Sequence, residues 1–179
     1  MDSSKLFSPS SRDLHALLGE HAQCGAHQLA LRLISLTPTP HLAHLSTGTS
    51  VYTWCVLDTL ILAGLLDCDV AVESRSPLSA QSLHASLSDG KLDANPKLVV
   101  SFPRVLDEGG APFTDSFCPY ANLFGSKEDY LDWAAHQARA TAAISLERAK
   151  SIALEFAHDV TTKEPDSAVV TSCTSTVCA

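Results

Sequence analysis

The chain has 179 residues, of which 45% are hydrophobic and 18% charged, and this is the composition of a globular protein with one core. Its formal net charge of −8 argues against nucleic acid or an anionic membrane surface as the main partner. Residues 1–12 lack the basic-then-apolar layout of a secretory signal, and six cysteines without such a signal predict free thiols in the reducing cytoplasm.

The N-terminal region is predicted to be helical. Apolar residues recur near helical spacing from Ser11 to Leu36, which predicts an amphipathic helix or a helix pair, with Gly19 and Gly25 as possible breaks. The Thr-Pro-Thr-Pro run at residues 37–40 ends this region, because each proline disfavours helix in the residue before it. We therefore expect a short helical appendage at residues 1–38.

The main domain is expected at residues 39–160. A strand and turn over 41–51 lead into an apolar helix over 54–66, a stretch too short to span a membrane and with Asp58 near its centre. Strands are predicted over 70–73, 83–87 and 97–102, a loop over 107–112, and helices after the N-cap Ser126 and over 146–156, whereas 141–144 fits either a strand or a helix.

These elements predict an α+β fold in which a mixed or antiparallel sheet packs with helices, because the strands and helices do not alternate as regular βαβ units. Residues 161–179 are rich in Thr and Ser and predict a flexible tail. The sequence has no Gly-x-Ser-x-Gly elbow and no phosphate-binding glycine loop, so it gives no support to a serine hydrolase or a nucleotide-binding protein.

A thiol and a carboxyl share the apolar helix. Cys55 and Asp58 are three positions apart, so on a helix their side chains lie on one face with Cβ atoms about 5–6 Å apart. Apolar neighbours raise the pKa of a carboxyl and make an unpaired charge costly, so a carboxyl placed there needs a partner or a function. Thiolates are natural ligands for soft metals. Taken alone, however, Cys55 is more often an inert core cysteine.

Two segments together are more specific than either residue. The nonapeptide Tyr-Thr-Trp-Cys-Val-Leu-Asp-Thr-Leu at 52–60 is followed by Ser-Phe-Cys at 116–118, with the two cysteines 63 positions apart (118 − 55). These segments resemble the catalytic half of the organomercurial (alkylmercury) lyases, and the similarity runs from about residue 39 to residue 156. The resemblance implies an enzyme that cleaves carbon–mercury bonds by protonolysis into a hydrocarbon and Hg(II).

The same resemblance assigns roles to three residues. Cys55 and Cys118 would be the mercury-binding thiols, and Asp58 would carry the proton and serve as a transient ligand. It also implies an organomercurial substrate, excess small-molecule thiol and no organic cofactor. Hg(II) would leave to low-molecular-weight thiols or to a mercuric reductase.

The chain departs from the family's pattern at several positions. Pro119 stands where familiar bacterial members have a further cysteine, and Ser76 stands where they have a structural one. Tyr-Ala-Asn at 120–122 replaces a His-rich strand, and the N-terminal region is shorter than the family's winged-helix-like domain. These departures leave two alternatives open: a non-catalytic thiol protein that sequesters soft metals, and a diverged enzyme that acts on another carbon–heteroatom bond.

Three further groups could bind metal, and each has a simpler interpretation. One histidine–cysteine group fits a polar helix stripe, and a His-x-x-His pair has no carboxylate nearby in sequence. Two cysteines in the tail could collect Hg(II) as accessory ligands or could be exposed without consequence. The groups are His21, Cys24 and His27; His41 and His44; and Cys173 and Cys178.

Overall fold

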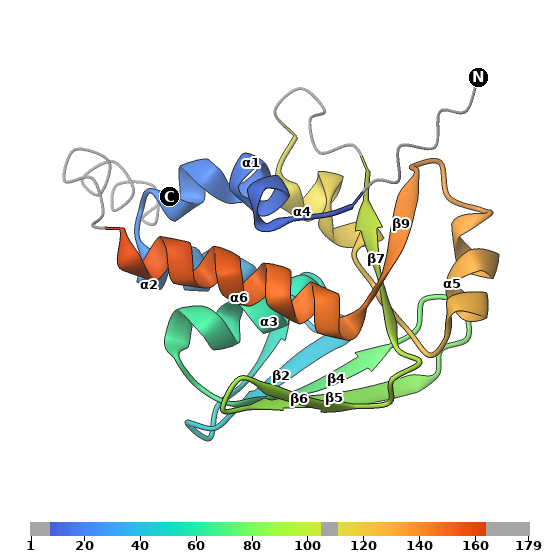
Figure 1. Cartoon of the computed structure of the whole chain (residues 1–179), viewed down its shortest axis with the longest axis horizontal. Helices are drawn as coiled ribbons and strands as arrows, with labels where there is room; N and C mark the ends of the chain where they lie inside the picture. The colour runs from blue at the N-terminus through green and yellow to red at the C-terminus, as the bar shows by residue number, and fades with distance from the viewer. Residues whose placement is uncertain (1–7, 105–110, 164–179) are drawn as a thin grey trace.

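The computed structural model describes residues 8–104 and 111–163, which form two antiparallel sheets and the helices that pack on them (Figure 1). The predicted α+β class is confirmed, and the sheets are antiparallel in every described pairing. The predicted tail, with Cys173 and Cys178, and most of the predicted loop over 107–112 lie outside the described residues.

The larger sheet has six strands in the order β1-β3-β2-β4-β5-β6. Its central strand β4 alternates buried and exposed residues along its length, so one face packs inward and the other is exposed. The strands predicted over 70–73 and 83–87 are confirmed, whereas β1 and β6 were not predicted. The six strands are Ile34–Ser35, His41–Leu45, Ser50–Thr53, Val70–Arg75, Ser82–Ser88 and Lys91–Ala94.

The smaller sheet has three strands in the order β8-β7-β9. Its central strand β7 (Val99–Pro103) pairs with β8 (Leu123–Phe124) and with β9 (Thr141–Ser145). The ambiguous segment over 141–144 is therefore a strand. Helix α5 (Lys127–Ala134) follows β8, and the predicted N-cap is confirmed because Ser126 Oγ accepts a hydrogen bond from the backbone N–H of Asp129.

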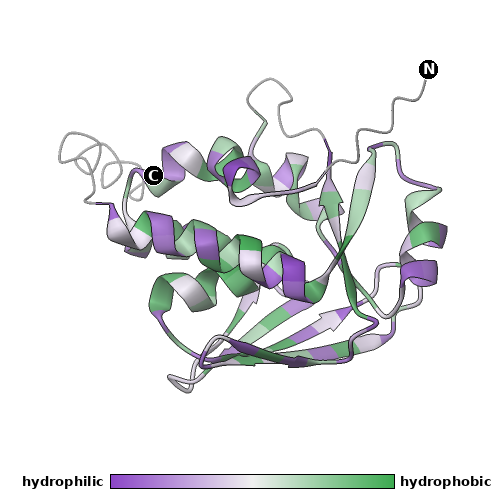
Figure 2. Cartoon of the chain, viewed as in Figure 1, coloured by the Kyte–Doolittle hydropathy of each residue, from purple (hydrophilic) through white to green (hydrophobic). Residues whose placement is uncertain are grey.

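Two helices are stacked above the larger sheet, α3 (Val56–Leu66) next to the sheet and α6 (Leu146–Thr162) beyond it (Figure 1). Helix α3 is apolar on nearly all sides, as Figure 2 shows, because it lies between that sheet and α6. A Cβ on Gly64 of α3 would lie 2.7 Å from the Ala157 Cβ of α6, so this glycine permits the close approach of the two helices. No helix in the described part of the chain is long and apolar enough to cross a membrane.

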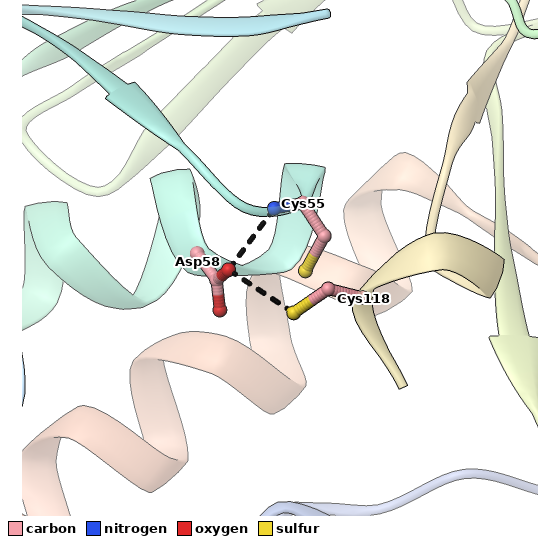
Figure 3. A group of neighbouring side chains, drawn as sticks. All are labelled: Cys55, Asp58 and Cys118. Atoms are coloured by element: carbon pink, nitrogen blue, oxygen red, sulfur yellow. Dashed lines mark hydrogen bonds between the residues drawn. The ribbon is translucent and has the colours of Figure 1, made fainter. Parts of the chain in front are cut away.

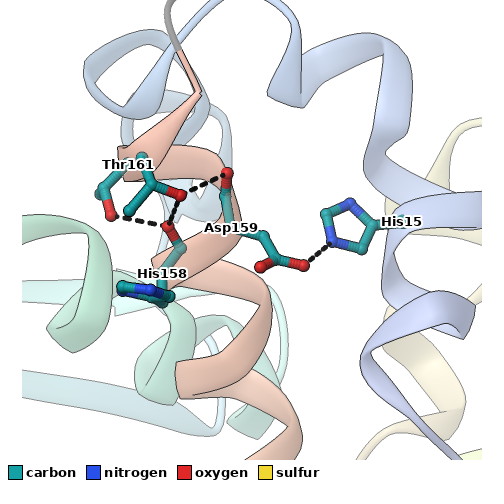
Figure 4. Close-up of polar contacts among 5 residues, drawn as sticks. His15, His158, Asp159 and Thr161 are labelled. Carbon is teal, nitrogen blue, oxygen red and sulfur yellow. Dashed lines mark hydrogen bonds and ion pairs between the residues drawn. The ribbon is translucent and has the colours of Figure 1, made fainter.

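The N-terminal region forms two helices, α1 (Ser11–Ala22) and α2 (Ala26–Leu33). The break lies at Gly25, which has a φ of 88°, whereas Gly19 lies inside α1. His15 of α1 contacts Asp159 of α6 through Nε2 and Oδ2 at 3.0 Å (Figure 4). The buried apolar residues of both helices belong to the main hydrophobic cluster. Whether residues 1–38 form a separate appendage stays a prediction.

Candidate active site

Cys55 and Asp58 lie at the beginning of α3. Cys55 is the N-cap residue with extended backbone (φ −148°, ψ 172°), so the helix begins one residue after it and two residues later than the predicted Trp54. The backbone N–H of Cys55 donates a hydrogen bond to Asp58 Oδ2 at 3.0 Å, and the two residues form a capping box. Both side chains therefore face the same point, although Cys55 is not inside the helix.

Cys118 approaches this pair from a different part of the chain. The short helix α4 (Phe113–Ser116) leads into a single 3-10 turn, Cys118–Tyr120. From the beginning of this turn, Cys118 Sγ donates a hydrogen bond to Asp58 Oδ2 at 3.5 Å (Figure 3). The backbone N–H of Val56 donates to the Ala121 carbonyl at 3.3 Å, which joins the end of the turn to the first residue of α3.

The three candidate residues form one compact cluster. One potential ligand atom from each of Cys55, Asp58 and Cys118 lies within 4.8 Å of the other two. Within the described ranges, this is the one group of three or more Cys, His, Asp or Glu side chains that could hold a metal ion. Two sulfurs and one carboxylate oxygen are a donor set that suits a soft, thiophilic metal.

The cluster lies almost completely out of contact with solvent. The exposed fractions are 0% for Cys55, 2% for Asp58 and 3% for Cys118. Burial raises the pKa of Asp58 from 3.8 to about 7, although hydrogen bonds from both cysteines oppose part of this shift. Burial also raises the pKa of the Cys55 thiol and raises that of Cys118 well above its ordinary value. The resting site therefore holds protonated thiols beside a carboxyl that can carry a proton near neutral pH.

A cavity of about 860 Å³ includes residues that are near the site in sequence, although none of Cys55, Asp58 and Cys118 lines it. Its walls come from α1, from the end of α2 and strand β1, and from the beginning of α4. Trp54, the residue before Cys55, forms part of the wall, and so does Phe113 at the beginning of the segment that leads to Cys118. The cavity therefore reaches the residue before Cys55 and the beginning of α4, the helix that precedes the Cys118 turn.

Three buried hydroxyl groups, which hydrogen-bond to the backbone near the two thiols or to one another, were not predicted from the sequence. Thr53 Oγ1 donates to the Cys55 carbonyl at 3.0 Å and shares a hydrogen bond of 2.8 Å with Thr59 Oγ1. On the other side, Ser101 Oγ donates to the Tyr120 carbonyl at 2.7 Å. All three hydroxyl residues are fully buried. The sequence did contain a signal for these hydroxyls, because small polar residues stand within otherwise apolar runs. A buried hydroxyl at such a position needs a hydrogen-bond partner.

Three of the four histidines proposed as weaker candidates, all except His27, take part in other contacts. The His21 ring packs edge-on against Phe113 with centroids 5.7 Å apart, His41 Nδ1 lies 2.8 Å from Ser74 Oγ, and His44 pairs with Glu73 at 3.3 Å. None of them is part of a metal-binding group among the described residues. Cys55, Cys68 and Cys118 are free thiols, but Cys24 is disulfide-bonded, so the expectation of free thiols is wrong for Cys24.

Comparisons with known proteins converge on one family. Residues 34–158, more than half of the chain, match the family model described as MerB, alkylmercury lyase. Alkylmercury lyases from Bacillus cereus and Clostridium butyricum are each 30% identical to the chain over 102 residues. That match covers 56% of the chain but only 45% of each relative, so the chain corresponds to about half of the length of these proteins.

A solved structure supports the fold. The crystal structure of the mercury-bound form of MerB2 superimposes with a TM-score of 0.61 and covers 85% of this chain and 82% of that one. At 24% sequence identity, this similarity shows a common fold.

Proposed function

The chain belongs to the alkylmercury lyase family, and from this premise we propose that it cleaves the carbon–mercury bond of organomercurials by protonolysis. The products would be a hydrocarbon and Hg(II). The observation that carries the proposal is the convergence of Cys55, Cys118 and Asp58 in one buried site, although the two cysteines are far apart in sequence.

In the first step, a thiol of the site replaces the small thiol that carries the substrate. The substrate is written R–Hg–SR′, because organomercurials bind thiols in solution. Cys55 forms a sulfur–mercury bond, and its proton leaves with R′SH. Mercury is a soft metal that favours thiolate ligands, so it removes the proton of a thiol whose pKa burial has raised.

In the second step, the other thiol binds and the carbon–mercury bond breaks. Cys118 forms a second sulfur–mercury bond, and its proton passes to Asp58, whose Oδ2 lies 3.5 Å from Cys118 Sγ. Asp58 then gives a proton to the carbon, and R–H leaves. The sum is R–Hg–SR′ plus two protein thiols to R–H, R′SH and Hg(II) held by two thiolates, with no net oxidation or reduction.

The raised pKa of Asp58 suits this role. A general acid works best when its pKa lies near the working pH, and burial brings this carboxyl from 3.8 to about 7. At about 1.36 kcal/mol per pKa unit, the change reduces the cost of accepting a proton from an unperturbed thiol by about 4 kcal/mol. An exposed aspartate would remain ionised and would have no proton to give at neutral pH.

The wider setting of the reaction is also proposed. Excess low-molecular-weight thiol would deliver the substrate and remove Hg(II), which would pass onward to such thiols or to a mercuric reductase in the cytoplasm. No organic cofactor takes part in the steps above. The cavity beside Trp54 is the side from which the organic group would approach the thiols.

Detection of the hydrocarbon tests the proposal. Purified protein receives phenylmercury or methylmercury with excess small thiol, and benzene or methane in the headspace is measured beside a Cys55→Ala control. We expect the hydrocarbon from the wild type alone. An Asp58→Ala variant separates this function from soft-metal sequestration, because a lyase loses turnover while it still holds mercury. Stoichiometric mercury binding by the wild type without hydrocarbon would favour the sequestration protein.

A further inference from the structure

The turn that carries Cys118 has every one of its backbone carbonyls hydrogen-bonded. The Cys118 carbonyl accepts from the Ala121 N–H at 3.1 Å, and the Ala121 carbonyl accepts from the N–H of Val56 at 3.3 Å. The two carbonyls between them accept from side chains instead: Pro119 from Asn122 Nδ2 at 2.9 Å, and Tyr120 from Ser101 Oγ at 2.7 Å. The side chains of Asn122 and Ser101 therefore donate to the two carbonyls of the turn that accept no hydrogen bond from the backbone.

Ser101 hydrogen-bonds the turn and the residue Asn122 that follows it. Besides its bond to Tyr120, Ser101 Oγ accepts from the N–H of Asn122 at 3.0 Å, and its own N–H donates to the Asn122 carbonyl at 3.0 Å. Ser101 lies near the centre of β7, which pairs with β8 on one side and β9 on the other. It is fully buried, so no water replaces these bonds if the hydroxyl is removed.

A buried histidine lies near Asn122. His41 Nδ1 lies 2.8 Å from Ser74 Oγ in strand β4, and the Asn122 side chain is close enough to the ring to affect its pKa. Burial lowers the pKa of His41 to about 4, so the ring is neutral at physiological pH. The neutral imidazole therefore adds no charge beside the Asn122 amide.

We propose that Ser101 and Asn122 are positioning residues that fix the Cys118 sulfur against Asp58 by hydrogen-bonding two carbonyls of the turn. This inference rests on the proposed function for its catalytic consequence. It also explains how the chain keeps the second thiol in place with Pro-Tyr-Ala-Asn at 119–122. The geometry of the Cys118 turn therefore depends on a donor from β7 and on a donor from the residue after the turn, and these two residues are hydrogen-bonded to each other.

A buried hydroxyl could equally contribute stability alone, so the test needs a matched control. Ser101→Ala removes the hydroxyl, whereas Ser101→Thr keeps a hydroxyl on a residue that favours strands. Tyr130→Phe is the control, because it removes a buried hydroxyl whose partner is Thr141 Oγ1 at 3.0 Å in the same sheet and not a group of the turn, while it keeps the ring in the cluster that packs against Tyr120. Asn122→Ala is a second test variant in case Ser101→Ala does not fold.

Two readouts are compared across these variants. The affinity for Hg(II) held by both thiols is measured by competition with a small dithiol and followed by mercury–thiolate ultraviolet absorption. Hydrocarbon turnover is measured separately, as kcat and KM. Ser101→Ala and Asn122→Ala should lose about 10-fold or more in two-thiol affinity and about 10- to 100-fold in kcat, because a small displacement of a reacting group is costly. Ser101→Thr and Tyr130→Phe should remain close to the wild type in both.

The outcomes separate this inference from the proposed function. Equal Hg(II) affinity in Ser101→Ala, Asn122→Ala and Tyr130→Phe would overturn the positioning role, whatever their turnover. A wild type that produces no hydrocarbon would refute the lyase, but the affinity comparison would still decide whether Ser101 and Asn122 position the thiol. Loss of affinity in Ser101→Ala with recovery in Ser101→Thr would support the inference.

Discussion

The two sulfurs of the site are held in opposite ways. Cys55 and Asp58 belong to four consecutive residues, and one capping interaction at the beginning of α3 fixes both. Cys118 lies in a three-residue turn whose position depends on hydrogen bonds from β7, from Asn122 and from Val56 of α3. One half of the site is therefore encoded locally, and the other half depends on the assembled fold.

This difference matters for the chemistry because the two halves have different tasks. In the proposed reaction, the local half brings a thiol and a proton carrier together through a contact within four residues. The second half would supply the thiolate that completes the coordination of mercury and the proton that the hydrocarbon receives through Asp58. Variants that affect the two halves separately should therefore fail in different ways.

The largest expected effect comes from removing the distant thiol. Cys118→Ala should reduce hydrocarbon turnover by about 10³-fold or more, as expected for deletion of an essential reacting group. Cys55 should still accept R–Hg, so mass spectrometry of the intact protein should find one organomercury group per chain. Near-wild-type turnover in this variant would show that the second half of the site is dispensable.

Asp58→Asn removes the proton carrier that both halves share. The amide oxygen can still accept the Cys55 N–H, so the beginning of α3 should be preserved. Turnover should fall by about 10²- to 10⁴-fold, the usual contribution of a positioned general acid. Titration with Hg(II) should still show one metal held by two thiols. If turnover persists within a factor of a few, the proton reaches carbon by another route.

The raised pKa of Asp58 also predicts a pH-dependent stability. Because the folded protein binds this proton more tightly than the unfolded chain, the contribution is full below pH 3.8 and is lost as the pH rises through about 7. Between pH 5 and 7.5 the wild type should lose about 2 kcal/mol of unfolding free energy that Asp58→Asn does not lose. Denaturant unfolding at both pH values measures the difference, and parallel curves for the two proteins would contradict it.

The smallest effect is expected from removing the Thr53 hydroxyl, which donates to the Cys55 carbonyl. Thr53→Val should lower the free energy of unfolding by about 1–2 kcal/mol, because the Cys55 carbonyl and the Thr59 hydroxyl lose a partner. Thr141→Val is a matched control in the smaller sheet. The capping box remains, so Hg(II) affinity should fall less than in Ser101→Ala. A larger fall in Hg(II) affinity would show that the positions of Cys55 and Asp58 also depend on contacts outside the capping box.

The same division explains what the sequence could predict. The three-residue spacing of Cys55 and Asp58 predicted a shared face, and the apolar surroundings predicted the raised carboxyl pKa. No spacing rule connects Cys118 to this pair, so its place came from the family resemblance. The N-cap position of Cys55 was missed because a capping box usually begins with Ser or Thr.

Other parts of the fold were missed for related reasons. Strand β6 has no fully buried residue and therefore no alternating apolar pattern to detect. Helix α6 continues to Thr162, past the predicted end of the ordered chain at Val160, although a run of Thr and Ser begins there. Ser101 was an isolated hydroxyl in an apolar strand, and only the folded structure shows which carbonyl it contacts.

The most direct test of the account is a deuterium-labelling measurement of the hydrocarbon. Protein equilibrated in D₂O receives phenylmercury with excess deuterated thiol, and the benzene is analysed by mass spectrometry. Protonolysis by the Cys55–Asp58–Cys118 site predicts one deuterium in each benzene molecule and one Hg(II) for each benzene released. Benzene without deuterium, or no benzene at all, would contradict the account.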